Sequence, residues 1–154
     1  MKTFFNISIF VLYGNLFCFG QNEISEIRKN YLLAKDFKGI EKLIISTNSN
    51  SENPLIISYN IVAELMMIEY EINPYKKLKV FNYLTNKIDS IIDKNSNNVE
   101  LRMLRYSIQK KSPFFLRYAD NINNDLTYIK QNLNTLTVNE IEYINTVLKR
   151  IIHG

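Results

Sequence analysis

Three prolines divide the sequence, and each follows a residue whose side chain can cap a helix. The pairs are Asn53-Pro54, Asn73-Pro74 and Ser112-Pro113. Asparagine or serine accepts a hydrogen bond from a free N–H of the first helical turn. Proline fits that turn because its missing N–H would have no partner there. We therefore predict that a helix begins at each pair, and that another begins at the capping box Thr137-x-x-Glu140.

Between these starts, apolar residues recur at the three- to four-residue spacing of an amphipathic helix. The predicted helices cover residues 23–35, 37–46, 54–72, 75–94, 98–111, 113–133 and 137–152. The polar run from Asn95 to Asn98 indicates a turn. Nothing in the pattern supports a sheet, and the short connections imply antiparallel neighbours. We expect an all-α fold of about six or seven helices, arranged as antiparallel helical hairpins in a bundle or a short TPR-like array.

The first twenty residues have the pattern of an export signal. Lys2 supplies a positive charge, an apolar segment runs from Phe4 to Leu16, and Cys18-Phe19-Gly20 precedes the polar sequence that begins at Gln21. We predict a signal peptide over residues 1–20 that is removed after Gly20. The rest, residues 21–154, is predicted to be a single all-helical domain, because a chain of this length forms one core.

Two other interpretations of this N-terminal segment exist, a lipoprotein anchored through Cys18 and a membrane anchor. Phe17 precedes Cys18 where a lipoprotein signal has a small residue, and the apolar segment is short for a membrane span. We therefore expect a periplasmic or secreted protein without stable membrane insertion.

Composition excludes most catalytic and metal chemistry. The only cysteine, Cys18, lies in the predicted signal, and the only histidine is His153. Disulfides, thiol catalysis, a Ser-His-Asp triad and multi-histidine metal sites are thereby excluded from residues 21–154. The four glycines form neither of the glycine-rich loops that hold nucleotides. We predict a non-enzymatic protein with no cofactor and no metal, although hydrolysis by carboxylates alone stays open.

The net charge of +4 is spread along the chain, with both signs interspersed. The densest basic groups are Lys76-Lys77-Lys79 and Lys110-Lys111. A nucleic-acid interface needs a more concentrated basic face. We interpret these lysines as solvated helix surface and expect no nucleic-acid partner.

One polar stripe carries the candidate site. Arg102, Arg105 and Gln109 are spaced i, i+3, i+7, which places them on one face of the helix predicted over 98–111. Tyr118 and Asp125, spaced i, i+7, share a face of the next predicted helix, and the turn at Ser112-Pro113 would fold the two helices together. Two guanidinium groups opposite a carboxylate and a phenol can form a hydrogen-bonded clamp between helices.

Two interpretations of this stripe stay open. It is either an Arg-lined pocket for an acidic ligand or peptide carboxylate, or a salt-bridge network that fixes the register of two helices. We favour the network. The interpretations differ in one observable: a network satisfies both arginines within the fold, whereas a pocket leaves guanidinium donors directed at solvent.

Two further groups have simpler interpretations. The run Leu65-Met66-Met67-Ile68 resembles an adaptable binding stripe, but core packing explains it better. Glu64, Glu69 and Glu71 do not share one helical face, so we interpret them as surface charge rather than as an acid–base pair.

Residues 73–129 resemble a family of uncharacterised exported proteins of Bacteroidetes, especially flavobacteria. The matching residues are Asn73-Pro74, Lys77, Phe81, Asn98, Glu100-Leu101-Arg102, Leu104-Arg105, Ser107-Ile108-Gln109, Pro113, Phe115-Leu116, Tyr118, Ile122 and Asp125. The resemblance leads us to expect an aromatic residue at Met103 and glycine at Arg117. It implies fold and location, and it transfers no functional residue. The segment from Phe81 to Arg105 also has weak tetratricopeptide character.

The functional expectation follows from these exclusions. We expect an exported, non-catalytic helical protein that acts as an interaction or structural module of the cell envelope, with another envelope protein as its partner. The alternative is a small-ligand or peptide-binding protein that uses Arg102 and Arg105.

Overall fold

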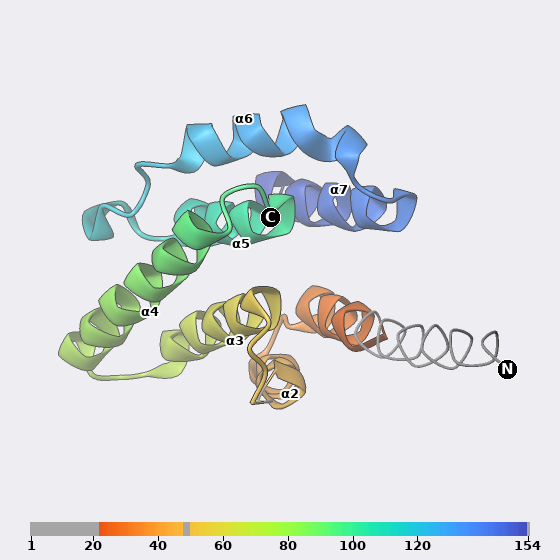
Figure 1. Cartoon of the computed structure of the whole chain (residues 1–154). Helices are drawn as coiled ribbons and strands as arrows, with labels where there is room; N and C mark the ends of the chain where they lie inside the picture. The colour runs from red at the N-terminus through yellow and green to blue at the C-terminus, as the bar shows by residue number, and fades with distance from the viewer. Residues whose placement is uncertain (1–21, 48–49, 154) are drawn as a thin grey trace, which may run out of the picture.

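The computed structural model describes residues 22–47 and 50–153, and within them the chain forms seven α-helices and no strand (Figure 1). The all-α prediction is thus confirmed. The predicted signal, residues 1–20, lies outside the described residues. The helices are residues 22–33, α2 (Phe37–Thr47), α3 (Pro54–Met67), α4 (Pro74–Lys94), α5 (Val99–Lys111), α6 (Ile122–Asn132) and α7 (Val138–His153), with 3₁₀ segments η1 (Ile68–Tyr70), η2 (Phe114–Leu116) and η3 (Leu133–Thr135).

Asparagine side chains cap three consecutive helices. Asn53 accepts a hydrogen bond from the Leu55 N–H at the start of α3, and Asn73 accepts two at the start of α4. Asn98, the last residue of the predicted turn, caps α5 in the same way. At α7, the Thr137 N–H donates to Glu140 Oε2 at 3.0 Å. The capping residues of the sequence therefore place these four starts correctly.

The prediction at Ser112-Pro113 is wrong. Ser112 ends α5, and its hydroxyl donates to the Ile108 carbonyl at 2.7 Å instead of capping a new helix. Only the short segment η2 follows, and it stops at Arg117, whose φ of 51° and ψ of 37° are left-handed. A left-handed residue cannot continue an α-helix. The predicted helix over 113–133 is therefore interrupted, and α6 begins at Ile122.

The helix predicted over 54–72 is also shorter than expected. It ends at Met67, and one 3₁₀ turn, η1, leads into the connection to α4. The helical spacing of apolar residues in the sequence extends through Ile68 and Ile72, but Ile72 is almost fully exposed. Apolar spacing alone therefore overstates the length of this helix.

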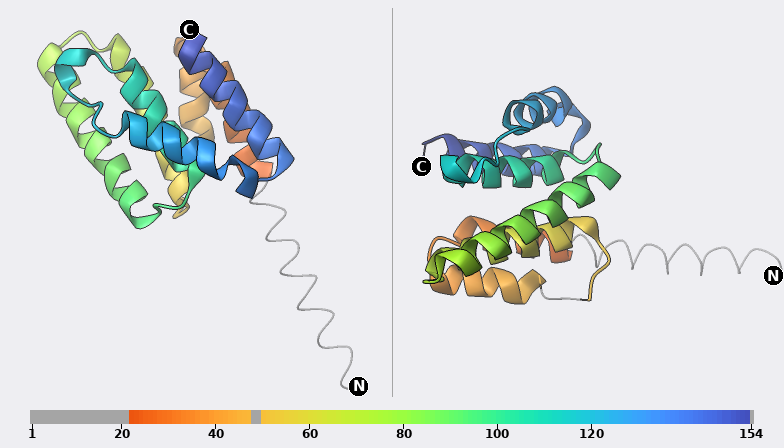
Figure 2. Two further views of the ribbon diagram at one scale, coloured as in Figure 1. Left: turned by 90° about the horizontal axis from the view of Figure 1, so that it is seen from above. Right: turned by 90° about the vertical axis from the view of Figure 1, so that its left-hand side faces the viewer.

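Helix α5 is the centre of the molecule. It packs against α3, α4, α6 and α7. Of its residues, only Arg102, Lys110 and Lys111 are not buried. Figure 2 shows α6 lying over α5 and α7, with residues 22–33, α2 and α3 on the opposite side and α4 running obliquely between the two groups. Every functional candidate described below touches α5 or the segment after it.

None of the helices within the described residues combines the length and the apolar character needed to cross a bilayer.

Candidate functional site

The arginine stripe of α5 faces carboxylates from two neighbouring helices. Arg105 donates to Asp125 on α6 through Nε and Nη2, both at 2.7 Å. Its third nitrogen, Nη1, reaches Asp89 on α4 at 3.1 Å. Asp125 is 0% exposed and Arg105 is 5% exposed. A two-pronged pair of this kind is among the strongest contacts between guanidinium and carboxylate groups.

Arg102 completes the same cluster. Its Nη1 lies 3.1 Å from Asp125 Oδ1, its Nε donates to the Ser96 carbonyl at 2.8 Å, and its guanidinium lies 4.2 Å from the centre of the Tyr128 ring. Both arginines thus have partners within the fold, which favours the salt-bridge network over an open pocket. We call Arg102, Arg105, Asp89 and Asp125 the arginine clamp.

Tyr118 does not meet Asp125 as expected. It lies in the connection before α6 rather than on that helix, and its hydroxyl donates to Asp89 Oδ1 at 2.9 Å. Its ring stacks edge-on against Phe81 of α4, with centroids 5.8 Å apart. Burial and the neighbouring Asp89 carboxylate raise the pKa of Tyr118 well above its ordinary value. Tyr118 is therefore a neutral donor that ties the η2–α6 connection to α4.

Gln109 lies on the stripe but does not join the clamp. Its side chain is buried, and its Oε1 atom has no hydrogen-bond partner among the described residues. The structure therefore brings Arg102, Arg105 and Asp125 together, places Tyr118 at the edge of the cluster, and leaves Gln109 apart.

A second buried ion pair occupies the opposite face of α5. Arg28 donates to both carboxylate oxygens of Glu100, at 2.9 and 2.5 Å. The Tyr59 hydroxyl donates to Glu100 as well and lies 2.6 Å from the hydroxyl of Tyr143. Burial, together with Glu100 and Tyr143, raises the pKa of Tyr59 well above its ordinary value, so the phenol stays neutral. This cluster joins residues 22–33, α3, α5 and α7.

Sequence reasoning missed Arg28 and Asp89, although a signal for each was present. Arg28 lies four residues after Ile24 and three before Tyr31, on the apolar face of its helix. Asp89 follows Phe81 by eight residues, next to the apolar face of α4. A charged side chain on an apolar face requires a buried partner. That requirement points to a carboxylate for Arg28 and a cation for Asp89.

An apolar pocket of about 800 Å³ lies between α3, α4, the C-terminal end of α5 and η2. Pockets that hold small molecules have volumes of roughly 300–1,000 Å³ and mostly apolar walls. The side chains of the wall that carry no polar group are Val62, Leu65, Met66, Ile68, Pro74, Leu78, Phe81, Ile108, Pro113, Phe115 and Leu116. Three of these belong to the run that the sequence assigned to core packing. Leu65 is in the core, and Met66 and Ile68 are partly buried beside the pocket.

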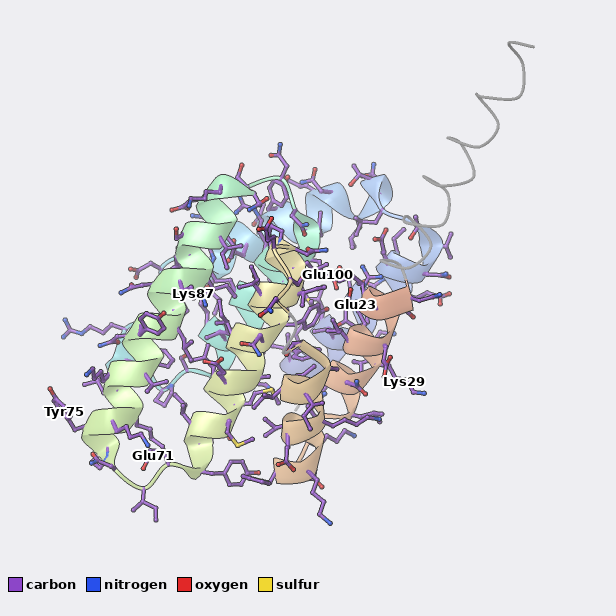
Figure 3. All side chains as sticks on the ribbon, turned by 60° about the horizontal axis from the view of Figure 1, so that its bottom comes forward. Glu23, Lys29, Glu71, Tyr75, Lys87 and Glu100 are labelled. Carbon is purple, nitrogen blue, oxygen red and sulfur yellow. The ribbon has the colours of Figure 1, made fainter. Side chains whose placement is uncertain are left out.

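The mouth of the pocket is apolar as well. Phe115 and Leu78 line the pocket and are 78% and 45% exposed. Two further exposed aromatic residues are near in sequence but do not line the pocket: Phe114, which precedes Phe115 and is 97% exposed, and Tyr75, which extends outward from the start of α4 (Figure 3). Exposed apolar residues that adjoin a cavity are typical of binding surfaces.

The polar groups of the wall are cations, one carboxylate and a few neutral groups. Lys77, Lys111 and Glu69 border the pocket. Both lysines belong to runs that we interpreted from the sequence as solvated helix surface. The hydroxyls of Ser107 and Ser112 donate to backbone carbonyls of α5, at 2.7 Å each. A serine engaged in this way, without a base beside it, is not an activated nucleophile.

Among the described residues, no group of histidine, cysteine and carboxylate side chains is placed to hold a metal ion. No protein-family model, curated protein or solved structure matches this chain. The resemblance to exported Bacteroidetes proteins and the tetratricopeptide character thus stay predictions.

Proposed function

We propose that this protein is an exported, non-catalytic binding protein that holds an apolar group in the pocket between α3, α4, α5 and η2. The observation that carries the proposal is the pocket itself. It is large enough for a small molecule, its walls are largely aliphatic and aromatic, and two of its apolar lining residues, Leu78 and Phe115, are exposed to solvent. Apolar surface left open to water in this way gains free energy when an apolar group covers it.

Of the two functions that the sequence left open, the pocket favours ligand binding, but at different residues. Arg102 and Arg105 direct their donors at Asp125, Asp89 and Ser96, which leaves them engaged within the fold. The pocket lies toward the C-terminal end of α5, where Ser107, Ile108 and Lys111 contribute to its wall. A partner protein of the cell envelope stays a prediction.

A neutral fluorescent probe tests the proposal. N-phenyl-1-naphthylamine gains fluorescence in apolar sites and carries no charge, so it reports on the pocket walls alone. We expect saturable binding of this probe to the purified protein. The variant Leu78→Glu places a carboxylate at the partly exposed wall of the pocket, and we expect it to weaken binding about tenfold or more, because the probe cannot satisfy the charge.

Tyr83→Glu is the matched control, because Tyr83 is an exposed apolar residue of the same helix that does not line the pocket. Probe affinity should be unchanged in this variant, and both variants should keep the thermal stability of the wild type to within a few degrees. Absence of saturable binding, or equal loss in both variants, would contradict the proposal.

Export has its own test. The pattern formed by Lys2, the apolar segment and Cys18-Phe19-Gly20 supports cleavage before Gln21. We expect the intact mass of the protein recovered from the periplasm or medium to correspond to residues 21–154. A mass that includes residues 1–20, or a lipid on Cys18, would contradict this part of the proposal.

A further inference from the structure

The wall of the apolar pocket contains two lysines, Lys77 and Lys111, and neither has a carboxylate partner among the described residues. Lys111, the last residue of α5, lines the pocket and forms no ion pair within the described part of the chain. The other lysine of the wall, Lys77, donates its Nζ to the Glu69 carbonyl at 3.0 Å. Lys111 therefore differs from Lys77 in that none of its three donors is engaged within the described residues, although both lysines keep an unpaired charge.

The surroundings of Lys111 favour an anion. Partial removal from water and the positive charge of Arg150 lower the pKa of Lys111, while Glu69 acts in the opposite direction. Arg150 directs its own donors to the carbonyls of Tyr31, Leu32 and Ala34. A negative group next to Lys111 would offset the repulsion between these two cations, and it would not have to displace an existing ion pair.

The rest of the wall suits a flexible aliphatic chain. Val62, Leu65, Met66, Leu78, Ile108 and Leu116 contribute branched or unbranched aliphatic side chains. Methionine adapts its shape to an irregular occupant. The pocket wall is thus largely aliphatic, and Lys111 adds a cation that has no ion-pair partner among the described residues.

We propose that the pocket binds a single-chain aliphatic carboxylate, with its chain against the apolar wall and its carboxylate beside Lys111. The inference rests on the proposed function, because it uses the same pocket, and it adds the chemical class of the ligand. Lys111, whose donors are all unengaged among the described residues, carries one positive charge and matches a group with one negative charge. It provides a point charge rather than the planar fork that suits bidentate recognition.

The test compares ligands of equal chain length by calorimetry, below the concentrations at which they aggregate. The probes are octanoate, decanoate and dodecanoate, with decan-1-ol as the neutral counterpart of decanoate. We expect affinity to rise about fourfold for each methylene until the pocket is full. We expect decanoate to bind about three- to tenfold more tightly than decan-1-ol, and this preference to weaken with added salt.

The variant Lys111→Gln isolates the charge. We expect it to remove the preference for decanoate while leaving the affinity for decan-1-ol within about twofold. Lys110→Gln is the matched control, because Lys110 is exposed, as Lys111 is, but does not line the pocket. This control should keep the full preference for decanoate.

The outcomes separate the two proposals. Equal binding of decanoate and decan-1-ol, or a preference that survives Lys111→Gln, overturns the carboxylate assignment and leaves the apolar pocket in place. Failure of every alkyl ligand to bind contradicts the proposed function itself. Lys111-dependent sedimentation with phosphatidylglycerol vesicles, without binding of the monomeric ligands, also overturns the inference and indicates a membrane surface instead.

Discussion

In the described part of the chain, charged side chains are paired near the N-terminal end of α5 and unpaired at its C-terminal end. In the arginine clamp, Arg105 and Asp125 are both buried and pair through two hydrogen bonds, with Asp89 and Arg102 completing the cluster. At the pocket, Lys111 has no ion pair among the described residues, and apolar walls stand open beside it. The charged groups of the arginine clamp are paired with one another, whereas at the pocket a lysine and an apolar surface have no partners within the described residues.

This difference shows where binding is to be sought. A cluster rich in charged residues stands out in a sequence, but satisfied groups have little free energy left to give a ligand. Groups whose requirements the fold leaves unmet are the better candidates. The comparison therefore predicts that changes in the clamp alter stability, whereas changes at the pocket alter binding.

Removal of the shared carboxylate is expected to have the largest effect. Asp125→Ala removes two of the three hydrogen bonds of the buried Arg105 guanidinium and the carboxylate partner of the partly exposed Arg102. We expect the free energy of unfolding to fall by about 3–5 kcal/mol. Urea denaturation measures this change, and Asp120→Ala, at an exposed position, serves as the control with an effect of less than about 0.5 kcal/mol. A cost below about 1 kcal/mol for Asp125→Ala would remove the distinction between the two ends of α5.

Tyr118 connects the two regions, because it binds Asp89 of the clamp and stacks on Phe81 of the pocket wall. Tyr118→Phe removes the hydrogen bond and keeps the ring. We expect a cost of about 1 kcal/mol in urea denaturation, with probe affinity within about twofold of the wild type. Tyr83→Phe, on an exposed residue, should change neither quantity. A large loss of binding in Tyr118→Phe would show that the clamp controls the shape of the pocket.

Glu140 is another charged residue with partners in the fold, and its contribution to stability is expected to depend on pH. Partial burial opposes its ionisation, but hydrogen bonds from Thr137 and Arg28 outweigh that effect and lower the pKa of Glu140 below its ordinary 4.5. A carboxylate whose pKa is lowered by folding contributes stability above its ordinary pKa and loses it as the pH falls through the folded value. Glu140→Gln keeps the capping box but carries no charge.

We therefore expect wild type to exceed Glu140→Gln in unfolding free energy by less than about 1 kcal/mol at pH 7, and the difference to shrink as the pH falls below about 4.5. Denaturation curves at several pH values measure it, with Glu142→Gln on the same helix as the control. A difference that does not depend on pH would mean that the Glu140 charge adds nothing to folding.

The smallest effect on stability is expected at Lys111. Because partial loss of hydration and the charge of Arg150 lower the pKa of Lys111, its charge is slightly unfavourable in the folded state. The contribution of Lys111 to the free energy of unfolding should rise as the pH increases toward 10.5, the ordinary pKa of lysine. In that range the folded protein loses the proton while the unfolded chain still holds it. Lys111→Gln should therefore leave the neutral-pH melting temperature unchanged or slightly raised. A clear loss of stability would show that Lys111 has a structural partner.

Much of the fold follows from local rules. Asn53, Asn73 and Asn98 start helices because their amide oxygens accept hydrogen bonds from the first turn. Ser112 looked like a fourth case, but a hydroxyl can also bond back to the preceding turn, as it does with Ile108. Position 117, where the family resemblance led us to expect glycine, has the left-handed backbone that glycine favours. Arginine itself gives no sign of a left-handed backbone, so the break before α6 could not be predicted from the residue at this position.

The site could be predicted only in part. The spacing of Arg102 and Arg105 predicted that they share one face of a helix. The turn after that helix predicted that Asp125 lies opposite them, as it does. Asp89 was missed because its contact depends on how α4 crosses α5, which no local spacing determines. The pocket was missed for the same reason: a concave surface exists only after three helices and η2 have packed. The side chains that line it resemble an ordinary core in the sequence.

The two ion-pair clusters on α5 differ in how much chain lies between their partners, and this has a kinetic consequence. Arg105 and Asp125 are 20 residues apart, whereas Arg28 and Glu100 are 72 apart. Closing the longer loop costs about 1 kcal/mol more in chain entropy. We therefore expect α5 and α6 to associate early in folding, and residues 22–33 to dock onto α5 late, as the step that completes the molecule.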